Sequence, residues 1–139
     1  MNAVAFHLRL VGAFMLLLVA MNIWEVPRRF RWKEEMAKLS LLNRQIFQVH
    51  AAFICIVLTL FAALVLGFTG PLLEPTPLAR AVLAGMGLFW FLRLLTQWFV
   101  YDRLIWRGQR FYTTMHFAFT ALWCYFTGTF AWALWSTVR

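Results

Sequence analysis

The chain has 139 residues, of which 63% are hydrophobic and 13% are charged, and its mean hydropathy is +0.73. Soluble domains are about half apolar and about a quarter charged, so this composition excludes an ordinary soluble domain. The net charge of +8 at pH 7 would suit nucleic-acid binding only if the basic residues formed one surface.

Apolar residues fall into four segments of spanning length, residues 4–24, 45–68, 78–101 and 111–135. About 20 apolar residues cross the hydrocarbon core of a bilayer as a helix. The first segment lacks an early positive cluster and a small-residue cleavage site, so we interpret it as a span and not as a signal peptide. The sequence therefore predicts an all-α integral membrane protein, a four-span antiparallel (up-and-down) helical bundle, with residues 1–139 as a single transmembrane domain.

The segment between the first two spans, residues 25–44, combines a breaker with an amphipathic pattern. Pro27 is expected to end the first helix after Trp24. Apolar residues then recur at roughly helical spacing among charged ones, at Phe30, Trp32, Met36, Leu39 and Leu42. This pattern is typical of a short interfacial amphipathic helix, for which we favour lipid contact over a soluble partner.

Local signals mark the ends of the other spans. Ser40 is expected to cap the second helix, and residues 69–71 are expected to end it. Thr76 followed by Pro77 predicts the start of the third helix, and Gly108 a turn before the fourth.

Two small residues in the third span, Ala81 and Gly85, have the spacing that lets another helix approach closely.

We interpret His7, near the start of the first span, as a residue of the outer interface.

Basic residues gather in two loops, which sets the expected orientation. They are Arg28, Arg29, Arg31, Lys33, Lys38 and Arg44 in the first loop, and Arg103, Arg107 and Arg110 in the second. Cytoplasmic loops carry such an excess, so loops 25–44 and 102–110 are expected in the cytoplasm and both termini outside, in a cell's inner (plasma) membrane. These charges are expected to contact membrane lipid, and no nucleic-acid partner is expected.

The alternating directions of the spans place five polar residues at similar depth in the inner half of the predicted bundle. They are Asn22, His50, Arg93, Gln97 and His116. All five acidic residues lie at or outside the interface, so Arg93 has no carboxylate partner within the spans. We expect Arg93 to use neutral oxygens such as that of Gln97, to reach the interface, or to bind an anionic ligand.

The sharpest hypothesis for this layer is a haem b group. His50 and His116 would be the axial ligands of the iron, while Arg93 neutralises a propionate and Gln97 completes the cofactor site. A chlorophyll-type pigment or a quinone hydrogen-bonded by Gln97 and His50 is a variant. The alternative is a cluster of hydrogen-bonded side chains without a cofactor.

No catalytic motif is visible, so the chain is not expected to be an enzyme. The function we predict is a non-catalytic small membrane subunit or anchor of a larger complex, such as an electron-transfer or energy-converting one. Its partners would be other membrane subunits or further copies of itself. One alternative is a haem-binding (or pigment- or quinone-binding) electron-transfer subunit. A second is a small oligomeric channel or transporter in which Arg93 and Gln97 select an anion.

Overall fold

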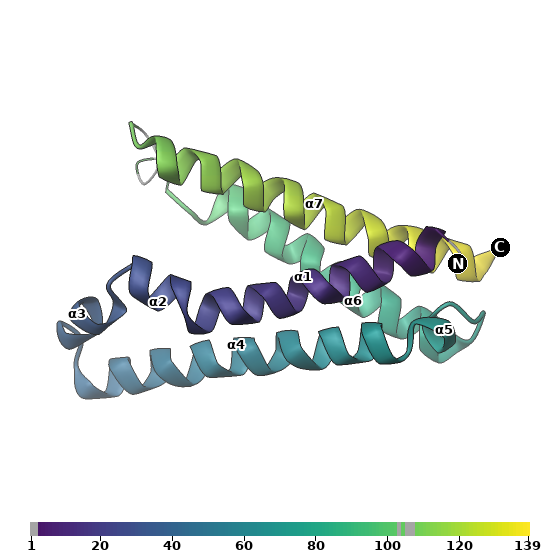
Figure 1. Ribbon diagram of the computed structural model, residues 1–139, viewed down its shortest axis with the longest axis horizontal. Helices are drawn as coiled ribbons and strands as arrows, with labels where there is room; N and C mark the ends of the chain where they lie inside the picture. Colours follow the sequence, from purple (N-terminus) through teal and green to yellow (C-terminus); the bar gives the residue numbers. More distant parts are fainter. Residues whose placement is uncertain (1–2, 103, 105–107) are drawn as a thin grey trace. The chain divides into compact units, whose positions relative to one another are not determined.

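The computed structural model of the protein describes residues 3–102, 104 and 108–139, and all regular structure in these residues is helical (Figure 1). The elements are α1 (Ala3–Ile23), α2 (Glu25–Arg29), α3 (Trp32–Ala37), α4 (Leu41–Gly67), α5 (Thr69–Leu72), α6 (Pro77–Phe99) and α7 (Arg110–Val138). In the described chain, four helical stretches are long and apolar enough to cross a membrane: Ala3–Arg29, Leu41–Gly67, Pro77–Phe99 and Arg110–Val138. The predicted all-α chain with four such helices is confirmed.

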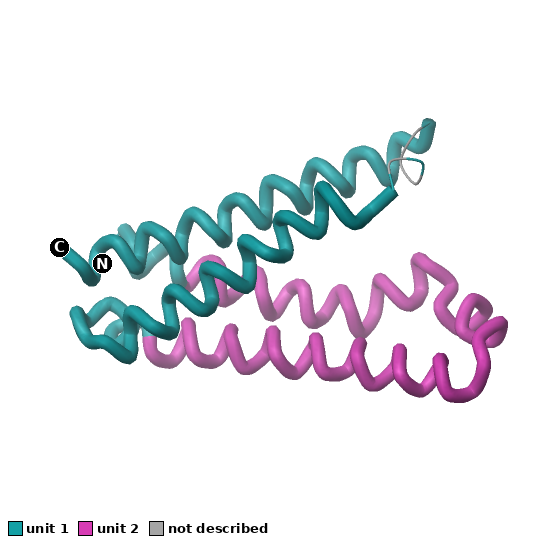
Figure 2. The backbone as a smooth tube through the Cα atoms, turned by 180° about the vertical axis from the view of Figure 1, so that it is seen from behind, with its two compact units in different colours: residues 1–8, 69–139 teal, residues 9–68 magenta. Residues whose placement is uncertain are grey.

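The helices fall into two compact units, which Figure 2 colours separately. The first, here called the α6–α7 unit, comprises Met1–Leu8 and Thr69–Arg139. The second, the α1–α4 unit, comprises Arg9–Phe68, and the division falls inside α1.

Aromatic packing between α6 and α7 forms the core of the α6–α7 unit. Trp90 of α6 is 2% exposed, stacks on Trp123 with ring centroids 5.1 Å apart, and meets Phe126 edge-on at 4.7 Å. A Cβ on Gly87 would lie 3.4 Å from the Cβ of Phe130, whereas one on Gly85 would meet nothing within 4 Å. Within this unit α7 therefore approaches α6 closely at Gly87. No helix that the structure describes in this unit approaches Gly85, where a close approach was predicted.

Capping interactions fix the end of the α6–α7 pair where α6 begins and α7 ends. Thr76 Oγ1 accepts a hydrogen bond from the backbone N–H of Ala79 at 3.2 Å, which confirms it as the N-cap of α6. Arg80 donates from Nε and Nη2 to the carbonyl oxygen of Thr137 at 3.1 and 2.6 Å, which binds the start of α6 to the last turn of α7. Gly108, before α7, has φ +84°, as expected for a turn that favours glycine.

The α1–α4 unit is organised around α4. Ser40 Oγ accepts from the backbone N–H of Asn43 at 3.4 Å, which confirms the predicted N-cap and starts the helix at Leu41, four residues before the apolar span. The polar residues before the span are therefore its first helical turn. At the other end α4 stops at Gly67, before residues 69–71 as predicted, and these residues begin the short helix α5.

The prediction for residues 25–44 is wrong in two details. The first helix ends at Ile23, within one residue of the predicted end at Trp24, but Pro27 is not the residue that breaks it, because Pro27 lies inside α2. Proline is tolerated there because a residue in the first turn of a helix has no intrahelical acceptor for its N–H. The expected amphipathic helix is divided into α2 and α3, because Arg31 adopts a left-handed conformation with φ 50°.

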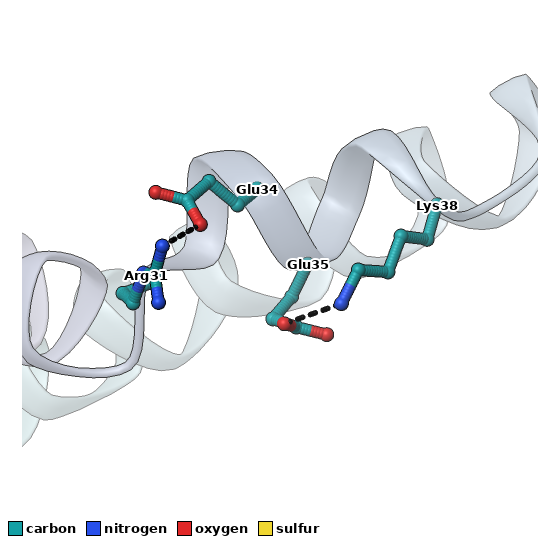
Figure 3. Close-up of polar contacts among 4 residues, drawn as sticks. All are labelled: Arg31, Glu34, Glu35 and Lys38. Atoms are coloured by element: carbon teal, nitrogen blue, oxygen red, sulfur yellow. Dashed lines mark hydrogen bonds and ion pairs between the residues drawn. The ribbon is translucent and has the colours of Figure 1, made fainter.

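Two exposed ion pairs follow this break along α3 (Figure 3). Arg31 pairs with Glu34, and Lys38 pairs with Glu35 at 2.7 Å. Exposed pairs of this kind contribute little to stability. Trp32 provides a firmer contact, since its ring meets that of Phe47 edge-on at 4.9 Å and so joins α3 to α4.

Candidate functional site

Arg93 lies on α6 and is held by residues one turn further along the same helix. Its Nη1 donates to Thr96 Oγ1 at 3.1 Å and to Gln97 Oε1 at 3.4 Å, as predicted for Gln97 from the spacing of the two residues. The guanidinium carbon lies 5.1 Å from the ring centroid of Trp123 and 5.8 Å from that of Tyr101. Every one of these neighbours is uncharged, so none of them neutralises the guanidinium.

Gln97 connects Arg93 to α7. It is 6% exposed, and its amide nitrogen Nε2 lies 3.0 Å from Nδ1 of His116. Its oxygen Oε1 also accepts from Trp123 Nε1 at 3.4 Å. We call Arg93, Gln97, His116 and Trp123 the Arg93 cluster. All four side chains belong to the α6–α7 unit, and three of them were in the predicted polar layer.

The donors around Gln97 assign the proton on His116. Arginine and tryptophan side chains can only donate hydrogen bonds, so the amide oxygen of Gln97 must face Arg93 and Trp123. The amide N–H then faces His116 and donates to Nδ1, which must carry a lone pair. A neutral His116 therefore carries its proton on Nε2.

This arrangement bears directly on the haem hypothesis. An imidazole nitrogen that binds iron needs its lone pair, and a haem ligand normally uses Nε2 while Nδ1–H donates to an acceptor. In the Arg93 cluster Nδ1 is already an acceptor. Iron ligation by His116 would require the Gln97 amide to flip, so that its N–H groups face the N–H donors of Arg93 and Trp123. The structure thus favours the hydrogen-bonded alternative for His116.

The other two residues of the predicted layer belong to the α1–α4 unit. Asn22 Nδ2 donates to the carbonyl oxygen of Leu18 at 2.8 Å, within α1. His50 is exposed on α4, and its Nδ1 lies 2.8 Å from the carbonyl oxygen of Ile46. Since a carbonyl only accepts, Nδ1 is the donor and a neutral His50 keeps its lone pair on Nε2. The pairing of His50 with His116 stays a prediction.

A second polar pair in the α6–α7 unit was not anticipated as a contact. His7 Nδ1 lies 2.8 Å from the hydroxyl oxygen of Tyr125, and the His7 ring also packs on Trp132 with centroids 5.7 Å apart. His7 is therefore half-buried against α7, and its place at the outer interface stays a prediction. No local sequence pattern predicts this pair, because the two residues are 118 positions apart.

One buried hydroxyl group between α6 and α7 has no hydrogen-bond partner in the part of the chain that the structure describes. Thr127 lines an open groove of about 260 Å³ with Gly87, Phe91 and Phe130 among its walls. Its Oγ1 is buried and forms no hydrogen bond to any described residue. The other threonines of α7 all donate to a carbonyl oxygen of the preceding turn. Leaving a buried hydroxyl unpaired costs about 1–3 kcal/mol in a protein interior.

The described residues contain no group of three or more histidine, cysteine, aspartate or glutamate side chains able to hold a metal ion. Comparison of the chain with models of protein families, with curated proteins and with solved structures finds no match. The function therefore has to be inferred from the residues themselves.

Proposed function

We propose that the chain is a four-span protein of the inner membrane that serves as a non-catalytic subunit or anchor of a larger membrane assembly. In this proposal the four long helices form an antiparallel bundle, and the basic loops 25–44 and 102–110 face the cytoplasm. The distribution of basic residues supports the orientation. The four helices of spanning length support the insertion.

The observation that carries the subunit proposal is an exposed stripe on α4. The buried residues of this helix, Leu58, Ala62 and Val65, all lie in its second half. In the first half, Asn43, Phe47, His50 and Ile54 are all exposed, although Phe47 also contacts Trp32. They follow the spacing i, i+4, i+7, i+11, so they share one face, and this face continues into the buried Leu58 and Val65.

This stripe combines apolar and polar side chains in a way that suits a neighbouring helix better than lipid. Polar side chains at membrane depth are costly unless they pair, and hydrogen bonds between helices are a common solution. Nε2 of His50 remains an acceptor, since Nδ1 bonds the carbonyl of Ile46. A helix of another subunit with a hydroxyl or amide donor would satisfy it.

A photocrosslinking residue at Ile54 tests this proposal in intact cells. We expect Ile54 to give a crosslink to a different transmembrane protein that also co-purifies in stoichiometric amount in mild detergent. The matched control is Ala62 in the second half of the same helix, which is fully buried and should give no product. A product from Ile54 that contains only further copies of this chain, or no product, would contradict the subunit proposal.

The proposed orientation has its own test. A protease added outside intact spheroplasts should leave residues 28–44 uncut, and should cut them after the membrane is opened. Cleavage in intact spheroplasts would reverse the orientation without affecting the subunit proposal.

The haem-binding alternative keeps one specific observation in its favour. His50 donates its Nδ1–H to a backbone carbonyl and keeps a lone pair on Nε2, which is the form that axial histidine ligands adopt. His116 lacks this form in the Arg93 cluster. In an electron-transfer function, His50 would therefore be the first candidate for an axial ligand of the haem iron. An absorption spectrum of the purified protein tests whether haem is bound.

A further inference from the structure

The guanidinium of Arg93 has no counter-ion among the residues that the structure describes. Its hydrogen bonds to these residues run through Nη1 alone, to the neutral oxygens of Thr96 and Gln97. The acidic residues of the α6–α7 unit are Glu74, which precedes α6, and Asp102, whose Oδ1 accepts from the backbone N–H of Leu104. The positive charge therefore remains to be balanced by something outside these residues.

The two nitrogens without a bond to the described residues are Nε and Nη2. The N–H bonds of Nε and Nη2 on one side of a guanidinium run parallel and form the fork that binds two oxygens of a phosphate or carboxylate. Thr96 and Gln97 thus hold the nitrogen that is not needed for this fork. Arg80 shows the same pair of nitrogens in use, since its Nε and Nη2 both donate to Thr137.

The neighbours of Arg93 also show where along the helix its charge lies. Side chains on a helix normally lean toward its N-terminus. The neighbours of the Arg93 guanidinium on α6 and just beyond it, Thr96, Gln97 and Tyr101, all lie toward the C-terminus. The charge is therefore nearer to the end of α6 than its own Cα.

The length of α6 then sets the depth of the charge in a bilayer. Arg93 precedes the last residue of α6, Phe99, by six positions, which is about 9 Å along the axis. The whole helix is about 34 Å long at 23 residues, against a hydrocarbon core of about 30 Å. If α6 spans the bilayer, the guanidinium lies at the boundary between acyl chains and headgroups.

We propose that Arg93 binds the phosphate of an anionic phospholipid through its Nε and Nη2 fork, in the leaflet that contains the C-terminal end of α6. This inference rests on the proposed membrane insertion but not on the subunit role. The cation is pre-organised, because Gln97, which holds it, is itself bound to His116 and Trp123. Fixing the guanidinium in advance lowers the entropy that binding would otherwise cost.

A lipid suits this position better than a soluble anion. The guanidinium is half-buried between aromatic rings, and the exposed rings of Trp98 and Tyr101 lie near the same end of α6. Tryptophan and tyrosine are enriched at the level of the headgroups. Acyl chains can follow the apolar surface of α6, which a free phosphate cannot use.

Native mass spectrometry of the full-length, delipidated protein tests the proposal. The protein is titrated with phosphatidylglycerol, with phosphatidylcholine of the same acyl chains, and with inorganic phosphate. We expect the wild type to bind one phosphatidylglycerol more tightly than any phosphatidylcholine. Arg93→Gln should weaken this first site by about fivefold or more, the loss expected for one basic contact with anionic lipid. Arg110→Gln, which removes an exposed arginine at the start of α7, should change it by less than about twofold.

Three outcomes would overturn the proposal. Equal affinity of Arg93→Gln and the wild type for phosphatidylglycerol would remove Arg93 from the site. An equal loss in Arg110→Gln would show that the effect is general surface charge. Displacement of the bound lipid by stoichiometric inorganic phosphate would identify a soluble anion as the ligand instead of a lipid.

Arg93→Lys keeps the test decisive if Arg93→Gln does not fold. Lysine retains the charge but lacks the fork, so we expect a preference for phosphatidylglycerol with reduced affinity. Unchanged affinity in Arg93→Lys would contradict the fork geometry. A monomeric protein that binds the lipid as expected would support this site and contradict only the subunit proposal.

Discussion

Gln97 and His116 are joined across α6 and α7 by a hydrogen bond of 3.0 Å between the amide Nε2 and the ring Nδ1. The same amide accepts from Arg93 and Trp123 through its oxygen. One side chain thus supplies partners to three others in a mostly apolar helix pair. The proton position on His116 and the direction of the Arg93 guanidinium both depend on it.

Replacing Gln97 with leucine should destabilise the protein. Gln97→Leu leaves His116, Arg93 and Trp123 without their shared partner, for which we expect a loss of about 1–3 kcal/mol. The free energy of unfolding is measured by titrating the detergent-solubilised protein with dodecyl sulfate. Gln48→Leu on α4 is the control, because Gln48 is exposed and its replacement should change stability by less than about 0.5 kcal/mol. Equal stability of the two variants would mean that the cluster contributes nothing to folding.

The unpaired hydroxyl of Thr127 predicts an unusual response to valine. Thr127→Val removes a buried oxygen that bonds no described residue, so it should leave stability unchanged or raise it by up to about 1 kcal/mol. Thr129→Val is the matched change two residues along, where the hydroxyl donates to the carbonyl of Tyr125 at 2.8 Å. It should lower stability by up to about 0.6 kcal/mol, the average for side-chain hydrogen bonds between membrane helices. A larger loss in Thr127→Val than in Thr129→Val would show that the Thr127 hydroxyl does have a partner.

The two glycines Gly12 and Gly85 should respond to alanine in opposite ways. A Cβ on Gly12 would lie 2.8 Å from Leu66 Cγ, so Gly12→Ala forces α1 and α4 to adjust within their unit. We expect a loss of about 1–3 kcal/mol. A Cβ on Gly85 meets nothing within 4 Å, so Gly85→Ala should be neutral or stabilising by up to about 1 kcal/mol. The same dodecyl sulfate titration measures both, and a loss in Gly85→Ala would reveal a helix that packs there.

The haem hypothesis makes a prediction that distinguishes its two histidines. We expect His116→Ala to leave any Soret band unchanged, because the Gln97 bond holds its proton on Nε2. His50→Ala should shift or abolish such a band, since its Nε2 keeps a lone pair. Spectra before and after dithionite reduction provide the measurement. Loss of the band in His116→Ala would show that the Arg93 cluster rearranges around iron, and a colourless, folded protein would exclude haem.

Local features of this chain were readable from its sequence because they depend on neighbouring residues only. The four long helices follow from the lengths of the apolar segments. The caps at Ser40 and Thr76 follow from a side-chain oxygen placed three residues before a backbone N–H. The bond between Arg93 and Gln97 follows from the four-residue spacing within one helix. The left-handed Arg31 was missed, because arginine rarely adopts that conformation and no glycine marks the break.

Contacts between helices required the tertiary structure, because the sequence does not determine how far each helix is rotated about its axis. Equal depth was predicted for Gln97 and His116, but only their facing positions in α6 and α7 decide that they bond. The contact of His7 with Tyr125 had no local signal at all. For Arg93 the sequence by itself determined a cation within an apolar segment of spanning length that contains no carboxylate. The tertiary structure decided which nitrogen is held and which two remain open, since that depends on where Thr96, Gln97 and Trp123 place their side chains.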